Sequence, residues 1–389
     1  MSDVIYGESP PWVIVAGGFH REGGMDKANA ALAWHLVSHG ARVQLVGHSF
    51  ESELAAHPLV STHLVTRPRE SFLLGERLLD RKGSAVADAV RRDDPRTRIV
   101  VNGGNCAWPG INWVHYVHHA WHPPPGLGVE GLKNRISGRY FRRSELRALS
   151  KAELILANSE KTRADLIALP GILKDRVETL YLGSDPSWNV PGPADRAKAR
   201  RAFDIPGDRP VVVFVGAISS DGRKGFDTLW QAWRLLCEDP QWDGELLVAG
   251  GGRTIDAWRE KSVRAGIGER IRFLGFIRNV DELLAAADLL VSPARYEPYG
   301  LNVQEAICRG VPSIVTSSAG AAEKYPEWAR PLLLADPDDA GALAGVIRSW
   351  RASMPFWRSK FATLGEDFRR YTWDGMAAEL VRMVNERFR

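Results

Sequence analysis

The feature that most constrains the fold of this chain is a repeated alternation of short apolar runs with longer amphipathic stretches. The short runs are rich in Val, Ile and Leu at consecutive positions, which is typical of strands buried on both faces of a parallel sheet. The stretches between them have the length and the polar face of helices that cover such a sheet. The expected strands are residues 12–16, 43–46, 63–65, 99–101, 113–117, 154–157, 177–182, 211–215, 246–249, 271–274, 289–291, 313–316 and 332–334.

A segment rich in proline and charge, residues 189–208, interrupts this alternation before it starts again. The length of 389 residues suits two or three domains at roughly 100–200 residues each. We therefore expect an α/β protein with two doubly wound, Rossmann-like domains joined at about residues 183–209. In such sheets ligands bind at the carboxyl ends of the strands, and we expect two of these edges to face each other across a cleft.

The composition excludes several other classes of protein. Hydrophobic residues make up 44% and charged residues 25% of the chain, and these ordinary globular values exclude disorder as the main state. The apolar stretches are shorter than the ~18 residues of a membrane span, and we expect no secretory signal. The three cysteines lie far apart, so a disulfide framework and a zinc site are not expected, and a reducing cytoplasm fits best.

The strongest functional signal follows the expected strand 289–291, where two glutamates, Glu297 and Glu305, are separated by seven residues. Pro298 is expected to begin a helix, because its fixed φ suits a first helical turn. The amino end of that helix, with its free N–H groups and its dipole, would bind an anion such as a diphosphate. The donors would be the backbone N–H groups of Tyr299, Gly300 and Leu301.

Glu305 would lie two turns along this helix, roughly 9–12 Å from its start at 1.5 Å per residue. That length is about the separation of the sugar and the ribose in a nucleoside-diphosphate sugar, so each carboxylate could accept hydrogen bonds from one of them. At these residues the sequence resembles the retaining nucleotide-sugar glycosyltransferases of family 4, which have the GT-B fold. The resemblance implies that Glu297 holds the donor sugar and that Glu305 holds the ribose.

A second candidate loop connects the expected strand 211–215 to the next helix. Cationic side chains beside a helix N-terminus would stabilise the negative charge that builds on a departing diphosphate. The resemblance extends to this loop, where Gly216 and Lys224 match donor-binding and catalytic positions of the family. The family usually has an arginine directly after this glycine, whereas this chain has Ala217, and we expect the adjacent Arg223 to supply the charge.

A glycine-rich turn in the first half follows the expected strand 12–16 and opens the first helix. The turn departs from the G-x-G-x-x-G fingerprint, which a dehydrogenase with this architecture would need. The resemblance implies instead that Gly23 and Gly24 lie beside the donor phosphate.

Two adjacent histidines follow the expected strand 113–117. The sequence Tyr116-Val-His118 is similar to a family element whose histidine contacts the donor sugar and the acceptor. Because His118 would stand directly at the end of the strand, we expect His118 rather than His119 to face the cleft.

Residues 133–151 combine seven Lys and Arg residues with apolar positions. A basic amphipathic helix of this kind can lie on an anionic membrane surface, and a solvated surface helix explains the pattern equally well. Nucleic acid is not an expected partner, because no recognised nucleic-acid-binding module accompanies the charge.

The resemblance implies a retaining transfer of a hexosyl group from a nucleoside-diphosphate sugar to a hydroxyl acceptor, a glycan or lipid-linked molecule of the cell envelope. It places the enzyme in the cytoplasm, in peripheral contact with the inner face of the plasma membrane. The implied domains are residues 1–186 and 187–370, with a C-terminal helix of about residues 371–389 packing back on the first. No D-x-D motif follows an expected strand, so we expect no metal and no cofactor besides the donor substrate.

Two alternatives stay open at this point. A catalytically silent nucleotide-sugar-binding or scaffold protein of the same fold is the more serious one, because Ala217 replaces the usual arginine. A dehydrogenase would require the missing glycine fingerprint and an acidic residue about 20 positions further on.

Overall fold

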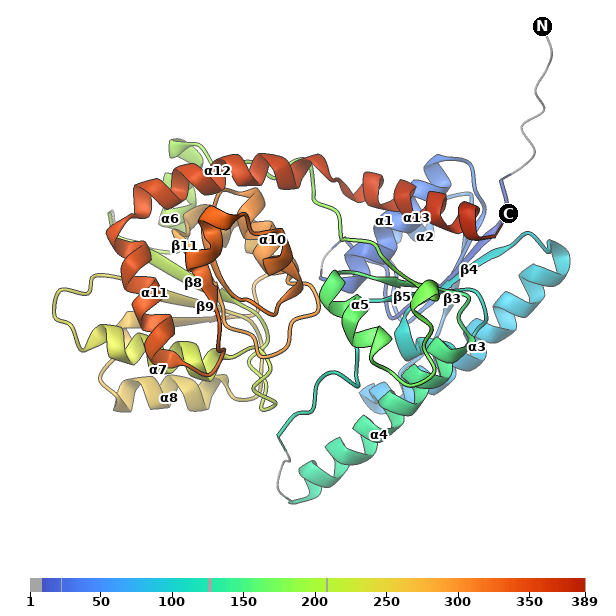
Figure 1. The fold of residues 1–389 in the computed structure, drawn as a ribbon, viewed down its shortest axis with the longest axis horizontal. Coiled ribbons are helices and arrows are strands. Elements are labelled where there is room, and N and C mark those ends of the chain that lie inside the picture. Colours follow the sequence, from blue (N-terminus) through green and yellow to red (C-terminus); the bar gives the residue numbers. More distant parts are fainter. Residues whose placement is uncertain (1–8, 22, 125–127, 208, 389) are drawn as a thin grey trace, which may run out of the picture. The chain divides into compact units, whose positions relative to one another are not determined.

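The computed structural model describes residues 9–21, 23–124, 128–207 and 209–388, and the chain forms two compact units. The first unit comprises Met1–Gly183 and Trp373–Arg389, and the second unit comprises Ser184–Thr372. Each unit contains one parallel β-sheet with helices packed on its faces (Figure 1). The expected fold class, α/β with two Rossmann-like sheets, is confirmed.

The first unit contains a seven-stranded sheet in the order β3-β2-β1-β4-β5-β6-β7. The central strands are buried along their length because helices cover both faces, so apolar residues occupy consecutive positions. The strands are β1 (Trp12–Val15), β2 (Val43–Gly47), β3 (Val60–Leu64), β4 (Arg98–Val101), β5 (Ile111–Val114), β6 (Leu154–Ala157) and β7 (Val177–Thr179). The α-helices are α1 (Met25–Ser38), α2 (Ser52–Ala55), α3 (Phe72–Asp93), α4 (Gly128–Lys151), α5 (Glu160–Ile167) and α13 (Trp373–Arg387).

The second unit contains a six-stranded sheet in the order β10-β9-β8-β11-β12-β13. Helices α7, α8 and α11 lie on one side of it and α6, α10 and α12 on the other (Figure 1). The strands are β8 (Val211–Val215), β9 (Glu245–Ala249), β10 (Ile271–Gly275), β11 (Leu289–Ser292), β12 (Ser313–Thr316) and β13 (Leu333–Leu334). The α-helices are α6 (Pro193–Ala202), α7 (Phe226–Cys237), α8 (Ile255–Arg264), α9 (Val280–Ala286), α10 (Leu301–Cys308), α11 (Ala340–Ala352) and α12 (Met354–Arg370).

The last helix of the chain, α13, packs against α1 of the first unit. Asp374 in its first turn accepts a hydrogen bond from the ring Nδ1 of His35, at 2.6 Å. At the other end of the helix, the Arg98 guanidinium donates to the carbonyl oxygen of Phe388 at 2.7 Å. Polar contacts at both ends therefore fix α13 on the first unit.

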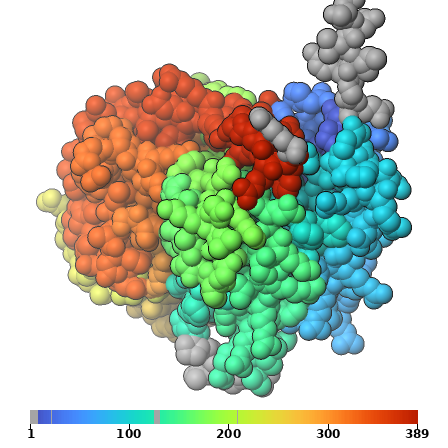
Figure 2. All heavy atoms as spheres, turned by 45° about the vertical axis from the view of Figure 1, so that its right-hand side comes forward, coloured from blue at the N-terminus to red at the C-terminus, as the bar shows by residue number. Residues whose placement is uncertain are grey.

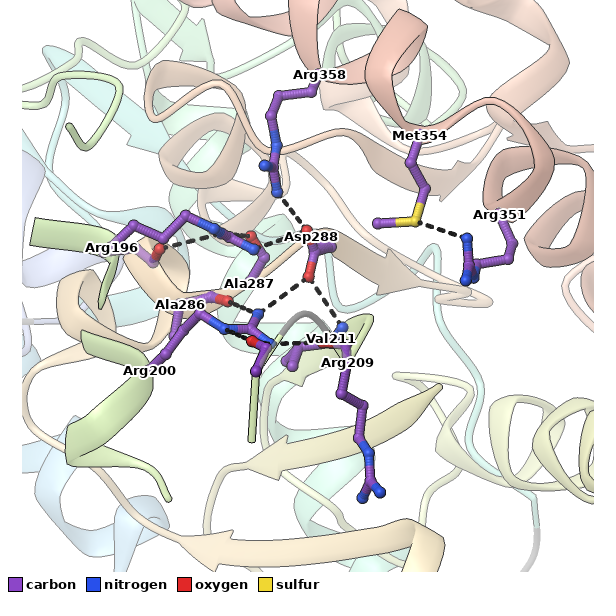
Figure 3. Close-up of polar contacts among 12 residues, drawn as sticks. Arg196, Arg200, Arg209, Val211, Ala286, Ala287, Asp288, Arg351, Met354 and Arg358 are labelled. Atoms are coloured by element: carbon purple, nitrogen blue, oxygen red, sulfur yellow. Dashed lines mark hydrogen bonds and ion pairs between the residues drawn. The ribbon is translucent and has the colours of Figure 1, made fainter. Parts of the chain in front are cut away.

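A buried carboxylate, Asp288, lies at the amino end of β11 and contacts several elements of the second unit (Figure 3). Its side chain accepts hydrogen bonds from Arg196 at 2.8 Å, from Arg200 at 3.4 Å and from Arg358. The backbone N–H of Val211 donates to the same carboxylate at 3.0 Å, where β8 begins. A buried charge is tolerated only when paired in this way, so Asp288 stabilises the junction of α6, α12, β8 and β11.

Helix α4 covers α3 and the loop after β4, and its amino-terminal part projects from the first unit (Figures 1 and 2). Leu132 and Ile136 on this part are exposed apolar side chains. Within the described ranges, none of the helices combines the length and the apolar character that crossing a bilayer requires.

Candidate active site

Two loops of the second unit carry the strongest candidates predicted from the sequence. They follow β8 and β11, which are parallel neighbours in the sheet, so both loops leave the same sheet edge. The first loop comprises residues 216–225, and its Gly216 N–H extends the ladder by donating to the Ala249 carbonyl at 2.9 Å. The second loop comprises residues 293–300 and leads into α10.

Gly225 brings the two loops into direct contact. Its φ of +67° lies in the left-handed region, and a Cβ at this position would collide with the carbonyl oxygen of Pro293 in the second loop. Glycine is therefore required for the close approach of the two backbones. Helix α7 begins directly afterwards at Phe226.

Lys224 and Glu297 meet between these loops. The Lys224 ammonium group donates a hydrogen bond to Oε2 of Glu297 and forms an ion pair with it. The two side chains are only 19% and 10% exposed, so water screens the pair weakly. The methylene stem of Lys224 passes beside Gly216, since Cδ and Cε would lie 3.7 Å from a Cβ placed there. The structure thus brings together three of the residues singled out in the sequence.

Arg223 and Arg295 hold the two loop backbones together. Arg223 Nη1 donates to the carbonyl of Tyr296 at 3.1 Å, and the Arg295 N–H donates to the carbonyl of Arg223 at 2.9 Å. The Arg295 side chain pairs with both carboxylate oxygens of Asp227, at 2.8 and 2.7 Å. Burial alone would raise the pKa of Asp227, but these hydrogen bonds lower it, and they raise the pKa of Arg295. Asp227 and Arg295 were not predicted from the sequence.

The helix after the second loop begins later than predicted. Helix α10 starts at Leu301, and Gly300 precedes it with a φ of +102°, so Pro298 lies in the loop and the prediction for it was wrong. The left-handed turn at Gly300 is the reason, because it separates the proline from the helical residues. Glu305 consequently lies four residues into the helix, about 6 Å from its start, rather than two turns.

Tyr299 takes part in the packing of this loop. Its carbonyl oxygen accepts a hydrogen bond from the Ala321 N–H at 2.6 Å, and its buried hydroxyl donates to Gln304. The first turn of α10 is tied to the sheet, since the Asn302 side chain donates to the Val215 carbonyl at 2.9 Å. These contacts fix the amino end of α10 beside the Lys224–Glu297 pair.

The structure also shows a pocket that was not predicted from the sequence. It has a volume of about 450 Å³ and lies at the carboxyl ends of β8 and β9, beside Gly216. Phe276, Ile277 and Val280 give it apolar walls, and the ring of Phe276 is largely exposed. The signal that could have revealed it is the run of three glycines at residues 250–252, directly after β9. At Gly250, whose φ is +152°, a Cβ would collide with the carbonyl oxygen of Gly216.

The glycine-rich turn of the first unit precedes α1. Gly24 is the N-cap residue of this helix, and Gly23 before it has a φ of +89°. Both glycines are exposed, and a Cβ at either position would meet no atom within 4 Å. The backbone of this turn is therefore accessible to a ligand.

The strand before the two histidines is shorter than predicted. It ends at Val114, its last residue paired with β6, and the following backbone forms a turn in which Ala120 donates to the carbonyl of Val117. His118 therefore follows the sheet at a distance of four residues rather than standing directly at the strand end.

A buried carboxylate fixes the orientation of both histidines. Glu145 accepts hydrogen bonds from the backbone N–H of His118 at 2.7 Å and from the ring of His119 at 2.7 Å. The ring of His118 stacks on Phe141 and lines a cavity of about 690 Å³ in the first unit. Burial lowers the pKa of His118 to about 4, and the neighbouring charges of His119 and Arg142 act in the same direction. His118 is therefore a neutral imidazole at physiological pH.

Comparison with known proteins identifies the family. The model described as "Glycosyl transferases group 1" matches residues 209–351, and the model described as "Glycosyltransferase Family 4" matches residues 22–188. The chain belongs to the family 4-like glycosyltransferases. These two matches cover β2 to β7 of the first sheet and β8 to β13 of the second, and they include the Lys224–Glu297 pair and the turn at His118.

Individual curated relatives are similar to this chain over part of its length. The D-inositol 3-phosphate glycosyltransferase of Corynebacterium efficiens is 28% identical over 266 residues, which cover 62% of this chain and 58% of the relative. The chain spans between 47% and 68% of the length of eight curated relatives that it matches.

Solved structures of the same fold match nearly the whole chain. WaaG, a glycosyltransferase involved in lipopolysaccharide biosynthesis, has a TM-score of 0.74 at 20% identity and covers 96% of this chain and 99% of its own. Anabaena HepE in complex with UDP and glucose has a TM-score of 0.71 at 17% identity and covers 97% of this chain and 100% of its own. At these identities the likeness establishes the GT-B fold.

Among the residues that the structure describes, no three His, Cys, Asp or Glu side chains gather in a group that could hold a metal ion.

Proposed function

We propose that the chain is a retaining glycosyltransferase that transfers a hexosyl group from a nucleoside-diphosphate sugar to a hydroxyl of an acceptor. The Lys224–Glu297 ion pair carries the proposal. A largely buried ammonium group suits the charge of a diphosphate, and a carboxylate beside it suits the hydroxyls of the attached sugar. Both side chains come from loops at the carboxyl edge of a parallel sheet, where ligands of such folds bind.

The donor diphosphate would lie between Lys224 and the amino end of α10. Backbone N–H groups at Gly300 and Leu301 and the helix dipole would add to the attraction of the ammonium group. Glu305, in the second turn of α10, would accept hydrogen bonds from the ribose. The presence of UDP and glucose in the HepE complex supports this class of donor.

The pocket at the ends of β8 and β9 would hold the nucleobase. Its apolar walls suit a flat base, and the exposed ring of Phe276 can stack on it. The glycines that line the pocket leave the backbone open to the base and its ribose.

Transfer would follow front-face displacement. The bond between the anomeric carbon and the donor phosphate oxygen breaks while the acceptor oxygen bonds the same carbon from the same face. The departing phosphate takes the acceptor proton, and the configuration of the sugar is retained. Lys224 and Arg223 would stabilise the charge that develops on the leaving group, Glu297 would orient the sugar, and His118 would lie on the acceptor side.

We propose that this reaction needs no metal ion, because Lys224 and Arg223 can supply the positive charge for the leaving group. Turnover is therefore expected to be unchanged by EDTA and by added Mg²⁺. A loss of activity with EDTA that Mg²⁺ restores would contradict this part of the proposal.

The acceptor is proposed to be a glycan or a lipid-linked sugar of the cell envelope. The exposed pair Leu132 and Ile136 lies on α4 beside Lys133, Arg135 and Arg139, so this end of the helix can dock on an anionic membrane. Cosedimentation with anionic vesicles, but not with neutral ones, is the expected result. Loss of cosedimentation in Leu132→Ser/Ile136→Ser would assign the contact to this helix.

The function is tested by screening UDP-, GDP- and ADP-sugars for a rise in melting temperature, since a ligand that binds only the folded chain stabilises it by mass action. The stabilising donor is then incubated with candidate acceptors, and NMR of the product gives the anomeric configuration. Retention is the expected outcome. An inverted product, or no stabilisation by any nucleotide sugar, would refute the proposal.

A catalytically silent donor-binding protein is the second candidate, and the position of the cationic side chains favours it. Exposed Ala217 carries no charge where the family usually has an arginine, and the Arg223 guanidinium that would replace it already donates to the Tyr296 carbonyl. Less positive charge would then stabilise the leaving group. Calorimetry with the stabilising donor and an assay of donor hydrolysis separate the two functions, because a silent protein binds the donor without turnover.

A further inference from the structure

The first unit contains a cavity of its own, with a volume of about 690 Å³. It is formed by residues 69–73, the loops after β4 and β5, and one side of α4. Its size lies within the range of roughly 300–1,000 Å³ that is typical of small-molecule sites. All the residues that line it belong to the first unit.

One wall of this cavity contains a histidine with no hydrogen-bond partner. His115 is only 7% exposed, and neither of its ring nitrogens is hydrogen-bonded among the residues that the structure describes. Burial lowers the pKa of His115 to about 3, so its ring is neutral and offers one donor and one acceptor. A buried polar group without a partner costs free energy, and a ligand hydroxyl, which both donates and accepts, can satisfy it.

A second unsatisfied group of the cavity is Glu76 on α3. Nothing in the described part of the chain donates a hydrogen bond to its carboxyl group. Burial raises the pKa of Glu76 to about 7; Arg67 opposes this shift and Glu145 adds to it. A hydroxylated ligand could therefore meet either form of this group, as a hydrogen-bond donor or as an acceptor.

The charges and the apolar side chains around the cavity limit what can bind. Arg69 and Lys133 share the lining with Glu70 and with Glu76, which balances the second cation when it is ionised, so the lining lacks the clear cationic excess that selects a phosphate. The lining also contains Phe72, whose side chain is 66% exposed. A ligand with an uncharged hydroxylated head and an apolar substituent fits both observations.

We propose that this cavity binds the acceptor as a neutral glycoside, in which His115 and Glu76 recognise the hydroxyls of the sugar ring and Phe72 contacts an apolar aglycone. The role of the glycoside as acceptor rests on the proposed function, whereas binding of the glycoside to the cavity is measured without any transfer.

The test is isothermal titration calorimetry of the full chain with octyl glycosides of glucose, galactose and mannose. The free hexoses and the hexose 6-phosphates serve as comparison ligands. At least one octyl glycoside should bind about tenfold more tightly than its free hexose, and the phosphates should bind no more tightly than the hexoses. No binding of any octyl glycoside, or tighter binding of a hexose phosphate, would overturn the proposal.

Variants assign the binding to the cavity. Glu76→Gln and His115→Phe should each weaken octyl glycoside binding by about tenfold, and Phe72→Ala should weaken it while leaving free hexose binding unchanged. Glu260→Gln, at an exposed position of α8, is the matched control and should bind as wild type. Wild-type affinity in both Glu76→Gln and Phe72→Ala would refute the assignment, even if His115→Phe fails to fold.

Titration of UDP, GDP and ADP into the same samples distinguishes this inference from the proposed function. Glycoside binding without nucleotide binding would support the cavity and refute the transferase. Nucleotide binding without glycoside binding would support the transferase and refute the cavity as a glycoside site.

Discussion

Lys224 and Glu297, which lie 73 residues apart in the sequence, form a largely buried ion pair at the carboxyl edge of the second sheet. Each side chain comes from a different loop, and Gly225 allows these loops to touch. A pair in this position can separate when a donor arrives, since the diphosphate would compete for the ammonium group and the sugar hydroxyls for the carboxylate. The residues therefore hold each other in place before the substrate binds.

Lys224→Met and Glu297→Gln are each expected to lower kcat by at least ~100-fold, because each removes a contact to the group on which charge changes in the transition state. Steady-state kinetics with the stabilising donor measures the effect. The double variant should be little slower than the worse single variant, because the two residues act as a unit.

Matched substitutions on the surface of the second unit control for charge and size. Lys198→Met on α6 and Glu260→Gln on α8 change exposed side chains and should keep wild-type kcat. Wild-type turnover in both Lys224→Met and Glu297→Gln would show that the pair is structural.

The nucleobase pocket gives a second prediction, from a glycine that lines it. A Cβ at Gly250 would collide with the Gly216 carbonyl and φ there is +152°, whereas a Cβ at Gly345, an exposed position of α11, would meet nothing within 4 Å. Gly250→Ala should weaken donor binding at least about tenfold and lower the melting temperature, while Gly345→Ala should leave donor binding unchanged and should not lower the melting temperature. Calorimetry and thermal unfolding measure the two effects. Equal donor affinity in both variants would argue against this pocket as the base site.

Local sequence patterns predict the strands of this chain but not the contacts between its distant segments. Apolar runs predict the parallel strands, because a strand that is buried on both faces needs apolar residues at consecutive positions. The start of α10 was mispredicted because the positive φ of Gly300 overrides the preference of Pro298 for a first helical turn. Contacts between distant segments determine two further features, the pairing of Lys224 with Glu297 and the His115 ring without a hydrogen-bond partner. Neither feature has a local signal in the sequence.

The arginine cluster around Asp288 predicts an effect on stability. Asp288→Asn would leave Arg196, Arg200 and Arg358 without their shared countercharge and should lower the free energy of unfolding by about 3 kcal/mol. Urea unfolding measures this, and Asp256→Asn, which breaks an exposed pair with Arg259, should cost less than about 0.5 kcal/mol. Similar stability losses in the two variants would mean that the buried cluster contributes no more than a surface pair.

The pKa of Glu76 predicts a pH dependence of stability with a defined sign. Burial raises this pKa from 4.5 to about 7, so the folded chain binds the proton more tightly than the unfolded chain does. The contribution of Glu76 to stability is therefore complete below pH 4.5 and is lost as the pH rises through about 7. His115 and His118, whose pKa values are lowered, act in the opposite direction, but they are present in wild type and variant alike.

The measurement is the difference in unfolding free energy between wild type and Glu76→Gln, obtained from urea titrations between about pH 5 and pH 8. Relative to the variant, which mimics the protonated acid at every pH, wild type should become steadily less stable as the pH rises. The same titrations of Glu260→Gln, at an exposed position of α8, provide the matched control. A flat difference for Glu76→Gln would show that this carboxyl group titrates normally in the fold, and the cavity would then hold an ordinary surface carboxylate rather than a desolvated one.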